Sequence, residues 1–146
     1  TQQSAAPIAQ SFGLTPQIEE RIIEPWNKLR GYPMGAKGLL SNPALAVHLY
    51  NPLQPSWGEP YEEIAQRMTD AALSAWDVAG GSDVVLVSHQ LPIWMTYLSA
   101  SGLRLPHNPR NRRCSLSSIT SFDVENGKLV PVDYREPGMN FLRDQN

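Results

Sequence analysis

Residues 83–92 read Asp-Val-Val-Leu-Val-Ser-His-Gln-Leu-Pro, a β-branched apolar run followed at once by a histidine, a polar residue and a proline. An uninterrupted apolar run of this kind is typical of a strand that is buried on both faces of a parallel sheet. We therefore predict a central strand over residues 83–88 and the next helix over residues 92–101. His89 then lies in the short connection between the two.

The preceding residues extend this alternation of strands and helices. Residues 60–79 carry an apolar stripe at helical spacing, with Pro60 suited to the first turn and Gly80-Gly81 behind the last one, so they predict a helix. The β-branched residues of 17–24 predict a short strand, and the apolar spacing of 1–12 predicts an amphipathic helix. This order indicates an α/β fold with a mainly parallel sheet flanked by helices.

The C-terminal end has the pattern of an antiparallel edge hairpin. Asn126-Gly127 separates the apolar segments 116–124 and 129–134, and Asn-Gly between apolar runs is a strong hairpin signal. With 146 residues, the chain has the length of one compact domain. We assign residues 1–136 to it and expect residues 137–146 to form a tail.

Residues 25–58 are rich in proline and glycine, which leaves room for one short helix at most, around residues 43–50. Long loops of this kind are commonly lids or binding loops. The aromatic residues that bracket this loop either line a substrate pocket or hold the loop in place; they are Trp26, Tyr32, Tyr50 and Trp57.

The composition, with 41% hydrophobic and 18% charged residues, is that of a globular protein. No apolar run approaches the ~20 residues that cross a bilayer, so we expect no membrane partner. The single cysteine, Cys114, cannot form an internal disulfide, and we expect it to pack in the interior of a protein from a reducing compartment, the cytoplasm. A formal net charge of −2 argues against a nucleic-acid partner. Residues 84–113 nevertheless hold four arginines and no carboxylate, and this segment is expected to attract anions.

His89 occupies the position at which open α/β sheets bind ligands, the carboxyl end of a strand just before a helix. Free N–H groups and the positive end of the helix dipole favour a phosphate there. From position alone, a structural histidine that bonds a neighbouring carbonyl is an equally good interpretation. No pairing of Cys or His residues indicates a metal site.

Several motifs together resemble the histidine phosphatase superfamily, in its phosphoglycerate-mutase-like branch. Val87-Ser88-His89 resembles the segment with the family's second active-site histidine, and Arg21-Ile22-Ile23-Glu24 resembles its Leu-x-Glu segment. Trp57-Gly58-Glu59-Pro60-Tyr61, with Arg67 in the following helix, resembles its Gly-Glu-Ser motif. Combined with the arginine-rich residues 109–114, the pattern is most similar to a branch common in actinobacteria.

The resemblance implies a phosphatase that hydrolyses phosphate monoesters through a phosphohistidine intermediate, with no cofactor and a small phosphorylated molecule as its partner. It implies that His89 donates to the phosphoryl group and that Glu24 is the candidate general acid and base. Glu59 is the second candidate, although it could instead orient an arginine or cap the helix that follows. Phosphate or substrate contacts are expected from His89, Gln90, Asn27, Arg110 and Arg113, while a solvated basic loop is the alternative for the last two.

One part of the family pattern is absent, because the nucleophile motif Arg-His-Gly occurs nowhere in the sequence. His48 and His107 follow no arginine and precede no glycine, so we expect both in loops or on the surface. We expect an upstream segment to supply the nucleophile and these 146 residues alone to be inactive. The alternative is a non-catalytic phosphate- or anion-binding module that has lost the nucleophile.

Overall fold

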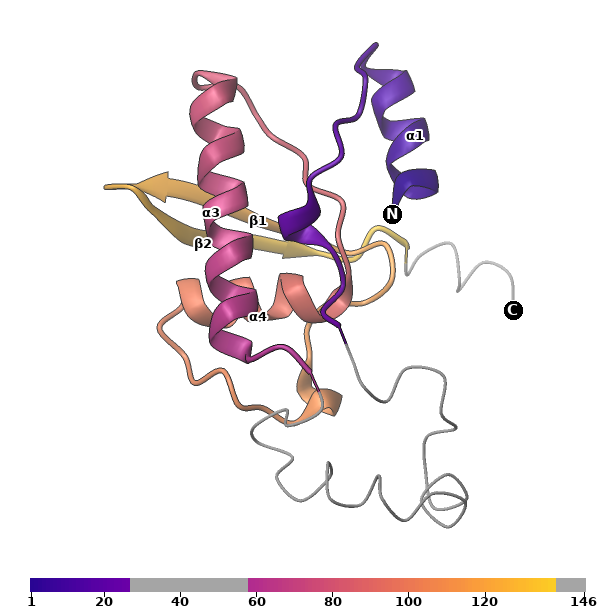
Figure 1. Cartoon of the computed structure of the whole chain (residues 1–146). Helices are drawn as coiled ribbons and strands as arrows, with labels where there is room; N and C mark the ends of the chain where they lie inside the picture. Colours follow the sequence, from indigo (N-terminus) through magenta and orange to yellow (C-terminus); the bar gives the residue numbers. More distant parts are fainter. Residues whose placement is uncertain (27–57, 139–146) are drawn as a thin grey trace, which may run out of the picture.

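The computed structural model describes residues 1–26 and 58–138 (Figure 1). Two helices, α3 and α4, cross one another, and a β-hairpin runs behind α3 and contacts both helices. The helix α1 buries none of its residues. In chain order the elements are α1 (Gln2–Ser11), the 3₁₀ turn η1 (Glu20–Ile22), α3 (Tyr61–Ala79), α4 (Gln90–Ala100), the 3₁₀ turn η3 (Pro109–Asn111), β1 (Ile119–Glu125) and β2 (Lys128–Arg135).

The helix α3 confirms the prediction for residues 60–79. Glu62 and Glu63 lie in its first turn, where the positive end of the helix dipole favours carboxylates, and Gly80 ends it in the left-handed conformation at φ 58°. Trp76 belongs to the same helix but lies outside the core, since this residue is 43% exposed. The buried face of α3 ends at Ala71 because α4 crosses only the N-terminal half of the helix.

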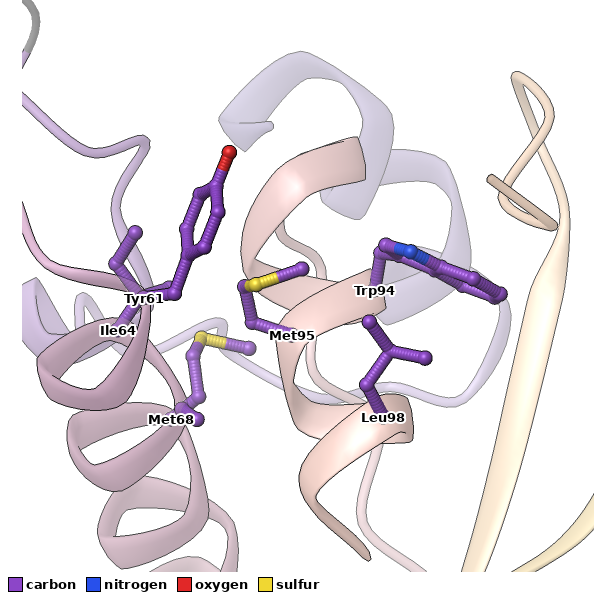
Figure 2. Packing of buried hydrophobic residues seen from close by; sticks show 7 residues of the cluster. Tyr61, Ile64, Met68, Trp94, Met95 and Leu98 are labelled. Atoms are coloured by element: carbon purple, nitrogen blue, oxygen red, sulfur yellow. The ribbon is translucent and has the colours of Figure 1, made fainter. Parts of the chain in front are cut away.

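The core lies between α3 and α4, and Figure 2 shows the Met68 and Met95 side chains meeting between the two helices. Ile64 and Met95 are completely buried. Burying a side chain of this size contributes about 1.5–3 kcal/mol, so these contacts are the main source of stability in this part of the fold. The buried members of the cluster are Tyr61, Ile64, Ala65, Met68, Trp94, Met95 and Leu98.

The helix α4 and the hairpin also follow the sequence-based expectations. The helix begins at Gln90, two residues before the predicted start, so that His89 is its N-cap residue. In the hairpin, Glu125 pairs with Lys128, and the two residues between them, Asn126 and Gly127, have φ of 51° and 73°. Positive φ at both positions is what a two-residue turn between twisted strands requires.

Two predicted strands do not form. Residues 83–89 have no regular secondary structure, and residues 17–24 contain η1. The described residues contain one sheet, the antiparallel pair β1–β2, so the predicted mainly parallel sheet is not found within them. A strand needs a neighbour for its ladder hydrogen bonds, and Val85, which was expected to be buried, is 66% exposed.

The observed helices and C-terminal antiparallel sheet are compatible with the predicted α/β class. The short helix expected around residues 43–50 lies outside the described residues, as does most of the predicted tail, residues 139–146. Within residues 1–26 and 58–138, none of the helices has the length and apolar character needed to span a membrane.

Replacing Ile64 with alanine should lower the free energy of unfolding by about 2–5 kcal/mol, because it leaves a cavity in the core between α3 and α4. Urea denaturation followed by circular dichroism measures this difference. Val78→Ala is the control on the same helix, since Val78 is 88% exposed and its truncation should change stability by less than about 0.5 kcal/mol. Equal effects of the two substitutions would contradict this location of the core.

Candidate functional site

The structure brings together two of the three residues that the sequence predicts to be catalytic, His89 and Glu24. Nδ1 of His89 lies 3.5 Å from Oε2 of Glu24, and their side chains are 41% and 48% exposed. Both groups are therefore accessible to a dissolved ligand. His89 has an extended backbone and its side chain does not cap α4. In the first turn the N–H groups of Gln90 and Leu91 are the ones that could meet an anion, because Pro92 has none and that of Ile93 donates to the His89 carbonyl.

Three successive backbone carbonyls just before Glu24 accept hydrogen bonds from side chains of other segments. The Arg67 guanidinium donates from Nη1 to the carbonyl of Arg21 and from Nη2 to that of Ile23, the latter at 2.9 Å. Between them, Ser88 Oγ donates to the carbonyl of Ile22 at 2.5 Å. Because side chains satisfy these carbonyls, this segment forms a turn and not the predicted strand.

Glu59 orients Arg67, which was one of the three roles considered for it. The carboxylate holds the guanidinium at two points, Oε1 at 2.6 Å from Nε and Oε2 at 2.9 Å from Nη2. Such a two-point contact between arginine and a carboxylate fixes the plane of the guanidinium. The structure shows no capping of α3 by Glu59, because Pro60 is the N-cap residue and no side-chain cap is formed.

Gln90 and Arg113, both expected at the phosphate, have protein partners. Gln90 Nε2 donates to the carbonyl of Cys114 at 2.8 Å, so this side chain joins the start of α4 to the arginine-rich segment. The Arg113 guanidinium lies 5.0 Å from the centre of the Tyr134 ring, within cation–π range. Cys114 packs in the interior as expected, and burial raises the pKa of its thiol.

A hydrogen-bond network that the sequence analysis missed holds the segment after Arg113. The Tyr134 hydroxyl and the Ser115 hydroxyl both donate to Glu136 Oε1, at 2.5 and 2.7 Å, and the Ser115 N–H donates to the Tyr134 oxygen at 3.1 Å. The two hydroxyl donors lower the pKa of Glu136. No local sequence pattern predicts this network, because Tyr134 and Glu136 meet Ser115 only when β2 lies beside the segment that follows Arg113.

Arg110 and Asn27 complete the expected contact set. The Arg110 side chain projects from the exposed turn η3, and within the described residues it forms no ion pair or hydrogen bond with Glu24 or His89. Asn27 lies outside the described residues, together with His48, Tyr32, Tyr50 and Trp57.

In the part of the chain that is described, no three His, Cys, Asp or Glu side chains group in a way that could hold a metal ion.

His107 lies in a loop, as expected, and both of its ring nitrogens have partners. Nδ1 is 2.8 Å from the Leu105 carbonyl and Nε2 is 2.8 Å from Arg112 Nε. Since a carbonyl only accepts and a guanidinium only donates, the proton of the neutral ring is on Nδ1. The ring also packs against the aromatic rings of Tyr61 and Trp94, with centroid distances of 5.5 and 6.2 Å. These contacts give His107 a structural role.

The fold places a histidine and a carboxylate side by side at the start of a helix, and such a pair can take part in hydrogen bonding and proton transfer with a ligand. The comparison with known proteins is more specific. The chain belongs to the histidine phosphatase superfamily, because the sequence model of that superfamily's branch 1 matches residues 1–137. The resemblance noted from the motifs is therefore confirmed.

Similar proteins come from two strains of Mycobacterium tuberculosis. They are the uncharacterized protein Rv0525 of strain ATCC 25618 / H37Rv and the uncharacterized protein MT0547 of strain CDC 1551 / Oshkosh. Each is 43% identical to this chain over 137 residues, which are 93% of this chain and 68% of the relative. Their source agrees with the actinobacterial branch expected from the sequence.

The surroundings of His107 predict a pH dependence of stability. Burial lowers the pKa of His107 below its ordinary value of 6.5, and the charge of Arg112 lowers it further, against the opposing effect of the Leu105 carbonyl. Below that ordinary value the unfolded chain binds a proton that the folded protein does not, so stability should fall as the pH decreases toward the lower pKa of the folded state.

Urea denaturation at about pH 7 and about pH 5 tests this linkage. The decrease in the free energy of unfolding should be smaller in His107→Gln than in the unmodified chain, since glutamine can keep both hydrogen bonds and does not titrate. An equal decrease in both proteins would show that His107 does not contribute to it.

Proposed function

We propose that the protein is a phosphatase that hydrolyses phosphate monoesters, with His89 binding the phosphoryl group and Glu24 acting as general acid and base. The observation that carries this proposal is the 3.5 Å separation of His89 Nδ1 and Glu24 Oε2. A proton donor beside a phosphate-binding histidine is what departure of an alcohol from phosphorus requires. Membership of the superfamily, which includes phosphatases and mutases, supports phosphoryl chemistry at this pair.

The reaction has two steps. A histidine of an upstream Arg-His-Gly segment attacks phosphorus, the bond from phosphorus to the substrate oxygen breaks, and the Glu24 carboxylic acid protonates that oxygen. The Glu24 carboxylate then takes a proton from water, the water oxygen attacks phosphorus, and the bond to the nucleophilic histidine breaks with release of phosphate. His89 donates a hydrogen bond to the phosphoryl oxygens throughout.

An upstream segment also accounts for the exposed apolar residues of 83–88. Val85 is 66% exposed in a run whose composition is typical of a buried strand. In our proposal this run pairs with strands of the upstream segment to give a mainly parallel sheet, and residues 1–136 are the C-terminal part of that single domain. The 137 aligned residues are 68% of the Mycobacterium tuberculosis relative, so that relative has residues outside the aligned part.

The arginine-rich segment is proposed to bind the substrate beyond its phosphate. Arg110 projects from an exposed turn, while Arg113 is steadied by the Tyr134 ring, and Asn27 follows the Glu24 segment. Gln90 contributes by holding the carbonyl of Cys114, the residue after Arg113. A small phosphorylated molecule and a cytoplasmic location belong to the same proposal.

Hydrolysis is preferred to phosphoglycerate mutation, because a mutase must retain its phosphohistidine against water and usually needs a more elaborate closure of its site. A non-catalytic anion-binding module is the second candidate. The absence of Arg-His-Gly from the 146 residues is the observation that favours it.

The first experiment determines the intact mass and N-terminal sequence of the protein as its source makes it, and then measures hydrolysis of p-nitrophenyl phosphate. We expect an upstream Arg-His-Gly segment, and a decrease in kcat of about 10²-fold or more in both His89→Ala and Glu24→Gln. Glu20→Gln is the matched control, since Glu20 is an exposed carboxylate four residues from Glu24, and its activity should be unchanged.

Two results would contradict the phosphatase. One is a natural protein without an Arg-His-Gly segment that binds inorganic phosphate and hydrolyses nothing, which would establish the binding module. The other is hydrolysis that is unaffected by either substitution, which would place the chemistry at other residues.

A further inference from the structure

Arg67 has the most extensively bonded side chain near the site, although it touches neither His89 nor Glu24. Its guanidinium contacts Glu59 at Nε and Nη2, the carbonyl of Arg21 at Nη1 and the carbonyl of Ile23 at Nη2. Four of its five N–H donors are therefore used. The charge is balanced by Glu59, so this arginine is not free to bind a phosphate.

The position of Glu24 depends on these contacts. The turn η1 before it contains no fully buried residue and belongs to no sheet, although Ile22 packs, partly buried, against the core. Beyond η1, the Glu24 carboxylate lies 3.5 Å from His89 Nδ1. The backbone next to Glu24 is held through the carbonyl of Ile23, which Arg67 binds, and through that of Ile22, which Ser88 binds. Ser88 directly precedes His89, so these bonds connect both members of the pair.

We propose that Arg67 is a positioning residue for Glu24. It fixes the carbonyls on either side of Ile22, Ser88 fixes the carbonyl of Ile22 itself, and Glu59 keeps the guanidinium in the plane that allows both bonds. The carboxylate of Glu24 is thereby presented to His89 in one place. The effect of Arg67 on catalysis rests on the function proposed above, whereas its effect on the geometry of the pair does not.

A double-mutant cycle on hydrolysis of p-nitrophenyl phosphate by the full-length protein tests the catalytic effect. Arg67→Met should lower kcat by about 10²-fold, because a displacement of a catalytic group by about 1 Å can have an effect of this size. It should leave KM nearly unchanged. In a Glu24→Gln background the same substitution should lower kcat by less than about twofold, because Arg67 acts through Glu24. Equal losses in both backgrounds would overturn the proposal.

Three further variants separate positioning from general destabilisation. Arg67→Lys keeps the charge but cannot hold both carbonyls and Glu59 together, so it should recover only part of the activity. Glu59→Gln keeps hydrogen bonding to the guanidinium and should lose less than Arg67→Met. Arg135→Met is the matched control, since Arg135 forms an exposed ion pair with Asp133 on the hairpin, and its kcat should be unchanged. If Arg67→Met does not fold, the cycle is run with Arg67→Lys, and the same criterion applies.

A crystal structure of the Arg67→Lys variant tests the geometry without any activity. We expect the Glu24 carboxylate to move away from His89 Nδ1, from the present 3.5 Å to beyond ion-pair distance. An unchanged distance would overturn the positioning role. If the unmodified full-length protein hydrolyses no phosphate ester, the proposed function fails, and this structure alone decides the role of Arg67.

Discussion

The site depends on one side chain, the guanidinium of Arg67, which binds a carboxylate on one side and two backbone carbonyls on the other. An arginine suits this role because its donors lie in a rigid plane, and a lysine would offer one point of charge on a flexible stem. The contact joins α3 to a segment that lies far from it in the sequence. Ile22 also packs against the core, but the carbonyls of Arg21 and Ile23, on either side of it, are both bound by Arg67.

Apolar packing and hydrogen bonding stabilise different parts of this structure. The apolar contacts between α3 and α4 fix the two helices relative to one another, and Figure 2 shows the Met68 and Met95 side chains between them. His89 and Arg67 are thereby positioned, because His89 is the N-cap residue of α4 and Arg67 lies on α3. Directional bonds then bring Glu24 to His89. A substitution in the core should therefore impair the site by lowering the stability of the fold. A substitution at Arg67 should instead impair it by moving Glu24 relative to His89.

Sequence patterns predicted the elements whose signals are local. The apolar stripe of residues 60–79 predicted α3, Asn126-Gly127 predicted the hairpin turn, and His89 was placed correctly at the start of a helix. The strands over 17–24 and 83–88 did not form, because ladder hydrogen bonds come from distant segments that a local pattern does not specify.

Only part of the site could be predicted from the sequence, because several of its contacts also come from distant segments. His89 and Glu24 were identified by resemblance to the superfamily, and the structure places them side by side. For Glu59, orientation of an arginine was one of three open roles, and only the bonds to Arg67 distinguish between them. The partners of Gln90 and of the three carbonyls could not be read from the sequence, since they are set by how the helices pack.

The central claim is that His89 and Glu24 act on one phosphoryl group. The most direct measurement is a crystal structure of the full-length protein with vanadate, which adopts the geometry of a phosphoryl group in transfer. We predict vanadate with one oxygen accepting a hydrogen bond from His89 and another within hydrogen-bond distance of the Glu24 carboxyl group. Vanadate bound elsewhere, or bound to His89 with Glu24 turned away, would contradict this account.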